Sequence, residues 1–477
     1  MMRLLPALLA LLLAGTSAAQ PTLVSTPESR DAVSLTVYNG GFGIVREVRS
    51  LELQRGDNRV RFEGVPARID PTSLSLASLT APGALSVLEQ NYQYNLIGTN
   101  SVLDAAVGQR IRLIRRIGAE TVVETGVLIS QPNQGRIVRL DDGRVLVNPE
   151  GTIELERLPD GLLSRPSLLW QLASARAGRQ QVEARYITEG ISWKSDYVAV
   201  VNESETGVDL TGWVTLSNQS GATYRDAALQ LIAGDVRRIQ PQMFRGRAQM
   251  EYAADVVQAR AAPQQESFFE YHLYTFPNPT SIAERETKQL ELLSAADVGV
   301  QRRLIFDGSG GYFPFYRAPR PGAGGATNEV AAAVVLEIEN AEANNMGMPL
   351  PAGTVRVYKA DRRGNLQFLG EDAIAHTARN ETVRLYIGDA FDVVGTRREV
   401  ANRRISDDER EITVEVEVRN RKATPVEVDV VERVFWGDWR ITQSSHEHER
   451  LDARTAQFAV SLGPDESKTV RYTARLQ

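Results

Sequence analysis

The stretch "GWVTLSNQSGATYRDAALQLIAGDV", residues 212–236, decides the fold class of this chain. Apolar and polar side chains alternate on both sides of a polar turn at 218–221, with the apolar positions at Val214, Leu216, Leu229 and Leu231. Alternation with period 2 is typical of a strand that buries one face. Asn, Ser and Gly favour a turn between such strands because they bond the local backbone or tolerate positive φ. The stretch therefore predicts two strands joined by a loop, with a structural role and no catalytic one.

The same alternation recurs along the whole chain. It is present in "AVSLTVYNGGFGIVREVRSLEL" (32–53), "NRVRFEGVPARIDPTSLSLASL" (58–79) and "EITVEVEVRN" (411–420). In the last of these, one face carries Ile412, Val414, Val416 and Val418, and glutamates occupy the other. We therefore predict an all-β protein of several antiparallel β-sandwiches with few helices. At roughly 150 residues per domain, 477 residues suggest about three domains.

Changes in the residue pattern along the chain predict how it divides into domains. An N-terminal β segment (20–90) precedes a small barrel-like module (91–160), in which five short strands follow a helix at 100–107. Asp142-Gly143 in this module is a strong hairpin signal. Packing is the default role of the module, since no aromatic groove for peptides or oligonucleotides is evident. A central β domain (161–400) with loops at 241–267 and 307–329 leads into a C-terminal β-sandwich (401–477).

The N-terminus has the features of a signal peptide over residues 1–19. One positive charge at Arg3 precedes a short apolar run, and Ser17 and Ala19 stand where a signal peptidase reads small residues before a cut at Gln20. The run is shorter than the roughly 20 residues that cross a bilayer, and no later stretch is long enough. We therefore expect an exported mature chain without a transmembrane span, located in the periplasm or cell envelope.

Composition excludes several classes of function. The chain has no cysteine, which rules out disulfides, thiol catalysis and thiolate metal sites. Its net charge of −6 and the lack of a basic block argue against nucleic-acid binding. Five of the 54 basic residues are lysine, so 49 are arginine. Arginine forks suit carboxylate or phosphate recognition, although a GC-rich genome is the simpler explanation of this bias.

The best metal-like cluster in the sequence is "HEHE" (446–449). On a strand, His446 and His448 would share one face, and two imidazoles at that spacing can chelate zinc or copper if a third ligand comes from elsewhere. The only other histidines are His272 and His376, which the sequence cannot place nearby. An exposed, charged strand explains the cluster equally well, and we favour that interpretation.

Other chemical motifs are missing or ambiguous. No G-x-S-x-G elbow appears, and the glycine-rich stretches lack the lysine of a P-loop, so no cofactor is predicted. Carboxylate pairs for glycoside hydrolysis cannot be distinguished among 60 acidic residues. The loop at 307–329 carries Tyr312, Phe313, Phe315 and Tyr316, which either contact a partner or glycan or pin the loop to a sheet.

Four stretches together resemble a known family. They are "VRFEGVPARIDPTSLSL" (60–76), "GISWKSDYVAVVNESETGVDLTGWVTLSNQSGATYRDAALQLIAGDV" (190–236), "FFEYHLYTFPNPTSIAERETKQLELL" (268–293) and "PLPAGTVRVYKADRRGNLQFLGED" (349–372). The chain resembles, over most of residues 31–477, an uncharacterised family of exported bacterial proteins related to the mucoidy-inhibitor-like group, whose shared region is a domain of unknown function. The resemblance implies β-rich folds and an envelope location, and it supplies no catalytic residues.

These observations lead to three hypotheses for the function. The favoured one is a non-catalytic envelope protein that binds or scaffolds an envelope protein or polymer through strand edges or aromatic loops. The second is an enzyme that acts on envelope polysaccharide with carboxylates as its catalysts. The third is an exported metal-binding protein. The oligomeric state stays open at this stage.

Overall fold

The computed structural model describes residues 21–130, 135–234, 236–238, 263–309, 329–433 and 438–476. These residues form strands almost throughout, with one α-helix, α1 (Thr99–Ala105), and the short 3₁₀ turns η1 (Pro27–Ser29) and η3 (Glu342–Asn344). The predicted all-β class is thereby confirmed. No helix in the described part of the chain has the length and apolar character needed to cross a membrane. The predicted signal peptide lies outside the described residues.

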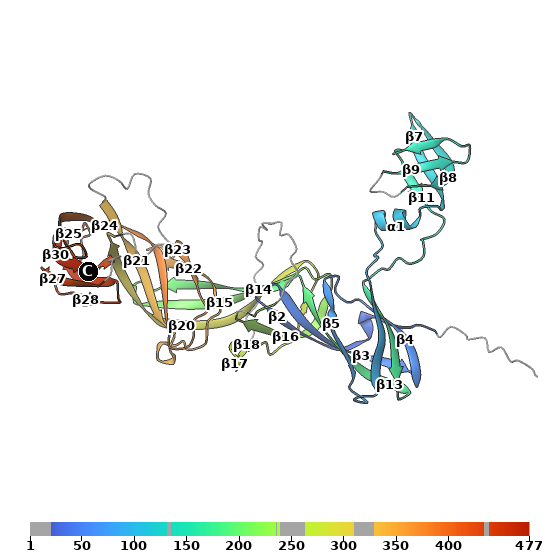
Figure 1. Cartoon of the computed structure of the whole chain (residues 1–477), viewed down its shortest axis with the longest axis horizontal. Coiled ribbons are helices and arrows are strands. Elements are labelled where there is room, and N and C mark those ends of the chain that lie inside the picture. Colours follow the sequence, from blue (N-terminus) through green and yellow to red (C-terminus); the bar gives the residue numbers. More distant parts are fainter. Residues whose placement is uncertain are drawn as a thin grey trace, which may run out of the picture.

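Two facing sheets form an N-terminal sandwich (Figure 1). The first sheet has the order β1-β4-β12-β6 and the second the order β17-β18-β16-β2-β3-β13-β5, with β19 paired to β16. Their bounds are β1 Leu23–Ser25, β2 Arg30–Tyr38, β3 Phe42–Leu53, β4 Gly56–Glu63, β5 Ile69–Ser78, β6 Leu85–Gln93, β12 Ser167–Ser174, β13 Gly178–Glu189, β16 Tyr224–Ala233, β17 Gln264–Phe268, β18 Tyr271–Thr275 and β19 Thr280–Ile282. Phe62 and Trp170 pack against each other in its core, with tilted rings whose centroids are 4.8 Å apart.

Strands from both sides of the small module complete this sandwich. β12 pairs with β4 and β6, and β13 pairs with β3 and β5. The predicted N-terminal β segment and the start of the predicted central domain therefore share one core. The module is an insertion between β6 and β12, and it projects from that end of the molecule (Figure 1).

The inserted module has the predicted number of strands but not the predicted closure. Its sheet has the order β10-β9-β8-β7-β11, with bounds β7 Arg110–Ile117, β8 Glu120–Leu128, β9 Ile137–Leu140, β10 Val145–Val147 and β11 Thr152–Glu154. β10 and β11 are its two edges and do not pair in the described structure, so the module is an open sheet and not a barrel. The hairpin at Asp142-Gly143 is confirmed between β9 and β10. The predicted helix is also confirmed, at Thr99–Ala105, with Gly98 as its N-cap.

A continuous sheet of 13 strands links the central and C-terminal parts. Two long strands carry it from one core to the next: β20 (Glu286–Asp307) has 22 residues and β24 (Thr382–Arg404) has 23. The other bounds are β14 Ile191–Val201, β15 Gly207–Asn218, β21 Glu329–Glu339, β22 Gly353–Ala360, β23 Leu366–Ile374, β25 Arg410–Asn420, β26 Val426–Arg433, β27 Trp439–Ser444, β28 Glu449–Arg450, β29 Thr455–Leu462 and β30 Ser467–Leu476. Figure 1 shows the resulting elongated molecule.

The stretch 212–236 contributes to two different sheets. β15 pairs with β14 and β20, whereas β16 pairs with β2, β18 and β19. The turn at 219–223 therefore forms an arch that crosses from one sheet to the other, and it is not a hairpin. Val214, Leu216 and Leu231 are fully buried at the positions that the alternation indicates.

A buried asparagine fixes this arch, and the same device occurs three times. Asn218 ends β15, Asn340 follows β21 and Asn420 ends β25, and all three are 0% exposed. Each side-chain amide donates to two backbone carbonyls, one in its own arch and one in a distant turn at Ala283, Ala378 or Gly463. Each side-chain oxygen accepts an arch N–H. We call all three connections asparagine arches. The first crosses between two sheets, whereas β21–β22 and β25–β26 stay within the 13-stranded sheet.

The predicted loops and the C-terminal sandwich need one correction. Residues 264–267, expected in the first loop, belong to β17, which pairs with β18. Most of both predicted loops lies outside the described residues. In the C-terminal sandwich, Val414, Val416 and Val418 are fully buried as expected, and β20, β21 and β24 add Leu304, Ala332 and Val393 to the same core.

Candidate functional site

The best candidate site is a cleft of about 530 Å³ beside the first asparagine arch. Residues 27–33, at the junction of η1 and β2, form one wall, and residues 221–226 of the arch and the start of β16 form another. Gly64, Arg165, Pro166 and Glu284 close the remaining sides. A volume of this size is typical of small-molecule sites.

Two glycines allow the walls to approach closely. Gly64 has a φ of +76°, and a Cβ there would lie 2.1 Å from Cγ of Pro27. Gly221 has a φ of +88°, and a Cβ there would lie 2.4 Å from Cβ of Ala67. Only glycine meets both demands, positive φ and a contact without a side chain. The local shape of the cleft therefore depends on these two positions.

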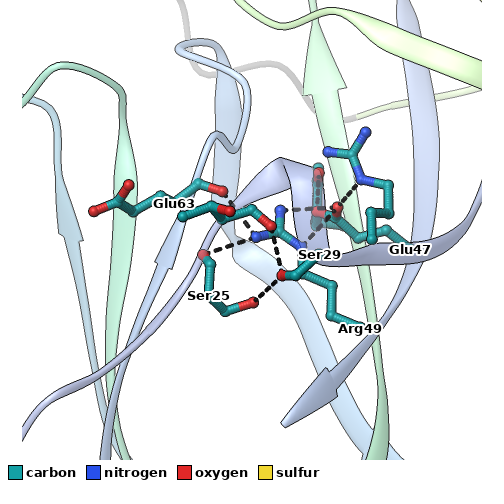
Figure 2. A network of polar contacts seen from close by, with 8 residues as sticks. Ser25, Ser29, Glu47, Arg49 and Glu63 are labelled. Carbon is teal, nitrogen blue, oxygen red and sulfur yellow. Dashed lines mark hydrogen bonds and ion pairs between the residues drawn. The ribbon is translucent and has the colours of Figure 1, made fainter.

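The buried ion pair of Glu47 and Arg49 lies next to the wall formed by residues 27–33 (Figure 2). Both side chains are 0% exposed. Nη1 of Arg49 donates to the backbone carbonyls of Ser25 at 3.0 Å and Glu63 at 2.9 Å, and Nη2 donates to Oε2 of Glu47 at 3.0 Å. The guanidinium also lies 3.5 Å from the ring centroid of Phe62. Arg49 thereby ties β1 and the end of β4 to the sandwich.

Glu47 is shared by more than one donor. Besides Arg49, it accepts from Nε of Arg30 at 2.6 Å and from the hydroxyl of Tyr186 at 2.8 Å. Burial lowers the pKa of Arg49, while the neighbouring Glu47 carboxylate raises it, and burial raises the pKa of Tyr186 well above its ordinary value. Arginine stays protonated in proteins. One carboxylate therefore balances two guanidiniums, which leaves one positive charge in excess.

Arg30 connects this network to the cleft. Its side chain is 9% exposed, and its Nε is bound to Glu47. Nη1 and Nη2 have no hydrogen-bond partner among the described residues, and the side chain lines both the cleft and an adjoining hollow beside Ser50 and Arg179. The terminal amino groups are therefore available as donors to a ligand.

Two further arginines line the cleft. Arg165 forms an ion pair with Glu28 at 2.8 Å, and this bond is the main reason why the pKa of Glu28 falls to about 2. Arg225, at the start of β16, is exposed and has no partner in the described structure. Arg225 thus offers a second unoccupied guanidinium.

The four carboxylates of the lining each accept a hydrogen bond within the protein. Glu28 accepts from Arg165, whereas the other three accept from neutral donors: Asp31 from Ser50, Asp226 from Ser281 and Glu284 from the Gly221 N–H. The cleft is consequently bipolar, because both of its main walls carry a guanidinium donor and a charged acceptor: Arg30 and Asp31 on one, Arg225 and Asp226 on the other. Such a lining can bind and orient a ligand with both kinds of group.

The structure places the sequence-predicted histidines in a loop. His446 and His448 lie between β27 and β28, not on a strand as predicted, because the chain bends after Ser444. Nδ1 of His446 is 2.9 Å from the Ser445 hydroxyl, and the ring of His448 packs against Phe458. Among the described residues, no group of three potential metal ligands occurs. The metal hypothesis for this pair stays a prediction.

The other predicted positions are less informative. Tyr312, Phe313, Phe315 and Tyr316 lie outside the described residues, so their role as a partner contact stays a prediction. The sequence could not place the remaining two histidines. Burial, followed by the charge of His376, lowers the pKa of His272, and Nδ1 of His272 lies 2.8 Å from Nε2 of Gln265.

The sequence pattern does not mark the cleft residues, although it carries one signal close to them. In "VREVRSLEL" (45–53), every second residue from Val45 to Leu51 points to the buried face of β3. Glu47 and Arg49 occupy the two middle positions of that face. Charged residues on an inward face indicate a buried ion pair or a site. No comparable signal marks Arg225, which is one exposed arginine among many.

Comparisons with protein-family models and with curated proteins give no match for this chain. The resemblance to the exported bacterial family therefore stays a prediction.

Proposed function

We propose that this protein is a non-catalytic component of the cell envelope that binds and scaffolds another envelope component. The observation that carries the proposal is the bipolar cleft, whose arginines Arg30 and Arg225 keep unoccupied donors toward it. Arginine does not exchange its proton in the physiological range, so these two side chains can hold an anionic group and cannot act as acid or base.

The shape of the molecule supports the scaffold part of the proposal. β20 and β24 run from one hydrophobic core into the next, so the central and C-terminal parts are joined through shared strands. The N-terminal sandwich shares no strand with this sheet and is joined to its central part through one continuous hydrophobic core. A continuous sheet of this kind resists bending between the cores. A ligand held at one end would therefore stay at a fixed distance from whatever contacts the other end.

The two alternative functions receive no specific support from the described residues. Every carboxylate in the cleft accepts a hydrogen bond, and no pair of them is bound only to solvent. The histidine pair of the metal hypothesis has no third ligand beside it in the described structure. We therefore retain binding and scaffolding as the single proposed function.

The test uses the tagged mature chain in its own host. The envelope is cross-linked gently, and the material that co-purifies is identified. One dominant envelope protein or polymer at near-equal stoichiometry is expected. Recovery of the protein alone, or from the cytoplasm, would refute the proposal. Substrate turnover by the purified protein that a single carboxylate substitution abolishes would replace it with the polysaccharide-enzyme hypothesis.

A further inference from the structure

The charges around the cleft restrict the kind of ligand that fits it. Three arginines and four carboxylates line the cleft, and Arg165 and Glu28 neutralise each other. Within the described residues, Arg30 and Arg225 keep unoccupied donors, while Asp31, Asp226 and Glu284 accept from neutral donors and have no ion-pair partner. A ligand with only negative charge would meet repulsion from these carboxylates, and one with only positive charge would meet the guanidiniums.

From this arrangement we propose that the cleft binds a zwitterionic amino-carboxylate, such as an amino acid or a dipeptide with both termini free. The ligand carboxylate lies against Arg30 and Arg225, and its ammonium group lies toward Asp226 and Glu284. This inference rests on the proposed binding function and specifies the chemical class of the bound group.

Arg30 is the anchor of the proposed site. It is nine-tenths buried, and its guanidinium is held at Nε by Glu47, a carboxylate that Arg49 also occupies. The excess positive charge of this network is stabilised when an anion approaches from the cleft. Charge-assisted hydrogen bonds to a guanidinium fork are among the strongest in proteins.

The opposite wall is held in place before any ligand arrives. Oε2 of Glu284 accepts from the Gly221 N–H at 2.8 Å, and the Glu284 N–H donates to Oγ1 of Thr223 at 3.1 Å. Asn218 fixes the same arch from beneath through its bond to the Ala222 carbonyl at 2.8 Å. Such preorganisation lowers the entropy that binding must offset.

Calorimetric titration of the purified mature chain tests the proposal. The probes are the dipeptide alanyl-alanine, its N-acetylated form, its C-terminal amide, glucuronate and inorganic phosphate, each used up to about 10 mM so that a millimolar Kd is detected. The dipeptide is expected to bind at one site per chain. Each of the other probes is expected to bind at least about tenfold more weakly, because each lacks the ammonium group, the carboxylate or both.

A pair of variants locates the binding site. Arg225→Gln changes an exposed side chain without a partner, so the fold is expected to persist. Loss of its charge-assisted bond is expected to weaken dipeptide binding at least about tenfold. Arg139→Gln is the matched control, since Arg139 is also exposed and unpartnered but lies on β9 of the inserted module. This control is expected to bind like the unaltered chain.

Several results would overturn the inference. The dipeptide could fail to bind up to about 10 mM, or its acetylated or amidated form could bind with equal affinity. Glucuronate or phosphate could bind more tightly than the dipeptide, or the Arg225→Gln variant could bind the dipeptide with an affinity within twofold of that of the unaltered chain. The failure of this inference is distinguishable from failure of the proposed function. If an envelope component cross-links equally to the Arg225→Gln variant, the scaffold function stands and the cleft is not its binding site. If the dipeptide binds in an Arg225-dependent way but no component cross-links, the cleft inference stands and the scaffold function fails.

Discussion

At the scale of single residues, the charge balance behind the cleft depends on Glu47. Its carboxylate is the only one within the buried network of Arg30, Arg49 and Tyr186. Removing one partner of a buried ion pair costs about 3–5 kcal/mol because the remaining charge is left uncompensated in a medium of low dielectric. Here two guanidiniums would lose their carboxylate.

Glu47→Gln is therefore expected to lower the free energy of unfolding by about 3–5 kcal/mol. Glu52→Gln makes the same change on the outward face of the same strand, where the side chain is exposed, and its expected effect is within about 0.5 kcal/mol. Urea unfolding monitored by tryptophan fluorescence measures both variants. Equal losses in the two variants would show that Glu47 does not stabilise the buried arginines.

Glu28 provides a pH-dependent test at the same scale. The hydrogen bond from Arg165, with further bonds from its own backbone and Thr26, lowers the pKa of Glu28 from 4.5 to about 2. A carboxyl group with a lowered folded-state pKa stabilises fully above its unfolded pKa and loses that effect as the pH falls. The stabilisation of η1 by this pair is thus complete above about pH 4.5 and is lost as the pH falls through about 2.

NMR titration of the Glu28 carboxyl carbon should give a midpoint near 2 in the unaltered chain. In Arg165→Gln the midpoint is expected to rise toward 4.5, because the largest cause of the shift is removed. A midpoint that does not change in the variant would mean that the ion pair of the structure is not formed in solution.

At the scale of elements, sequence periodicity predicts strands well and their partners poorly. Alternation identified β3, β15, β16 and β25, because burial of one face of a strand is a local property. The partners are distant: Glu47 on β3 meets Tyr186 on β13, 139 positions away. The arch after β15 and the open edges of β10 and β11 depend on such distant contacts, so the letters alone suggested a simple strand pair and a barrel.

The asparagine arches give a prediction for these elements. Asn420→Ala leaves the carbonyls of Thr424 and Gly463 and the Lys422 N–H without their buried partner. Each buried unsatisfied group costs about 1–3 kcal/mol, so the variant is expected to lose at least about 2 kcal/mol of unfolding free energy. Asn420→Asp should be equally damaging, since a carboxylate cannot donate to the two carbonyls.

Asn402→Ala is the control for this test, because Asn402 is exposed on β24 and its amide bonds only Glu399. Its unfolding free energy should stay within about 0.5 kcal/mol of the unaltered value. Hydrogen exchange should show faster exchange at 420–425 and 463–466 in the Asn420 variants alone. Unchanged exchange there would show that the arch does not need its asparagine.

At the scale of the whole molecule, the N-terminal sandwich is followed by a sheet that continues into the C-terminal sandwich (Figure 1). The cleft lies at the N-terminal sandwich. The first asparagine arch takes the chain from this sheet into the N-terminal sandwich, and the long strands β20 and β24 connect the successive cores. The proposed scaffold function depends on the distance between the cleft and the C-terminal sandwich as well as on the affinity of the cleft for its ligand. A component bound in the cleft is presented far from the C-terminal sandwich.

Photo-cross-linking in the native host tests the central claim, that the cleft holds an envelope component, most directly. One variant carries a photo-reactive amino acid at Ala32, an exposed residue of β2 in the cleft wall, and the matched control carries it at Ala459, which is exposed on β29 of the C-terminal sandwich. We predict a single dominant adduct at Ala32 that competes with added alanyl-alanine and is absent at Ala459. No adduct at Ala32, or the same adducts at both positions, would contradict this claim.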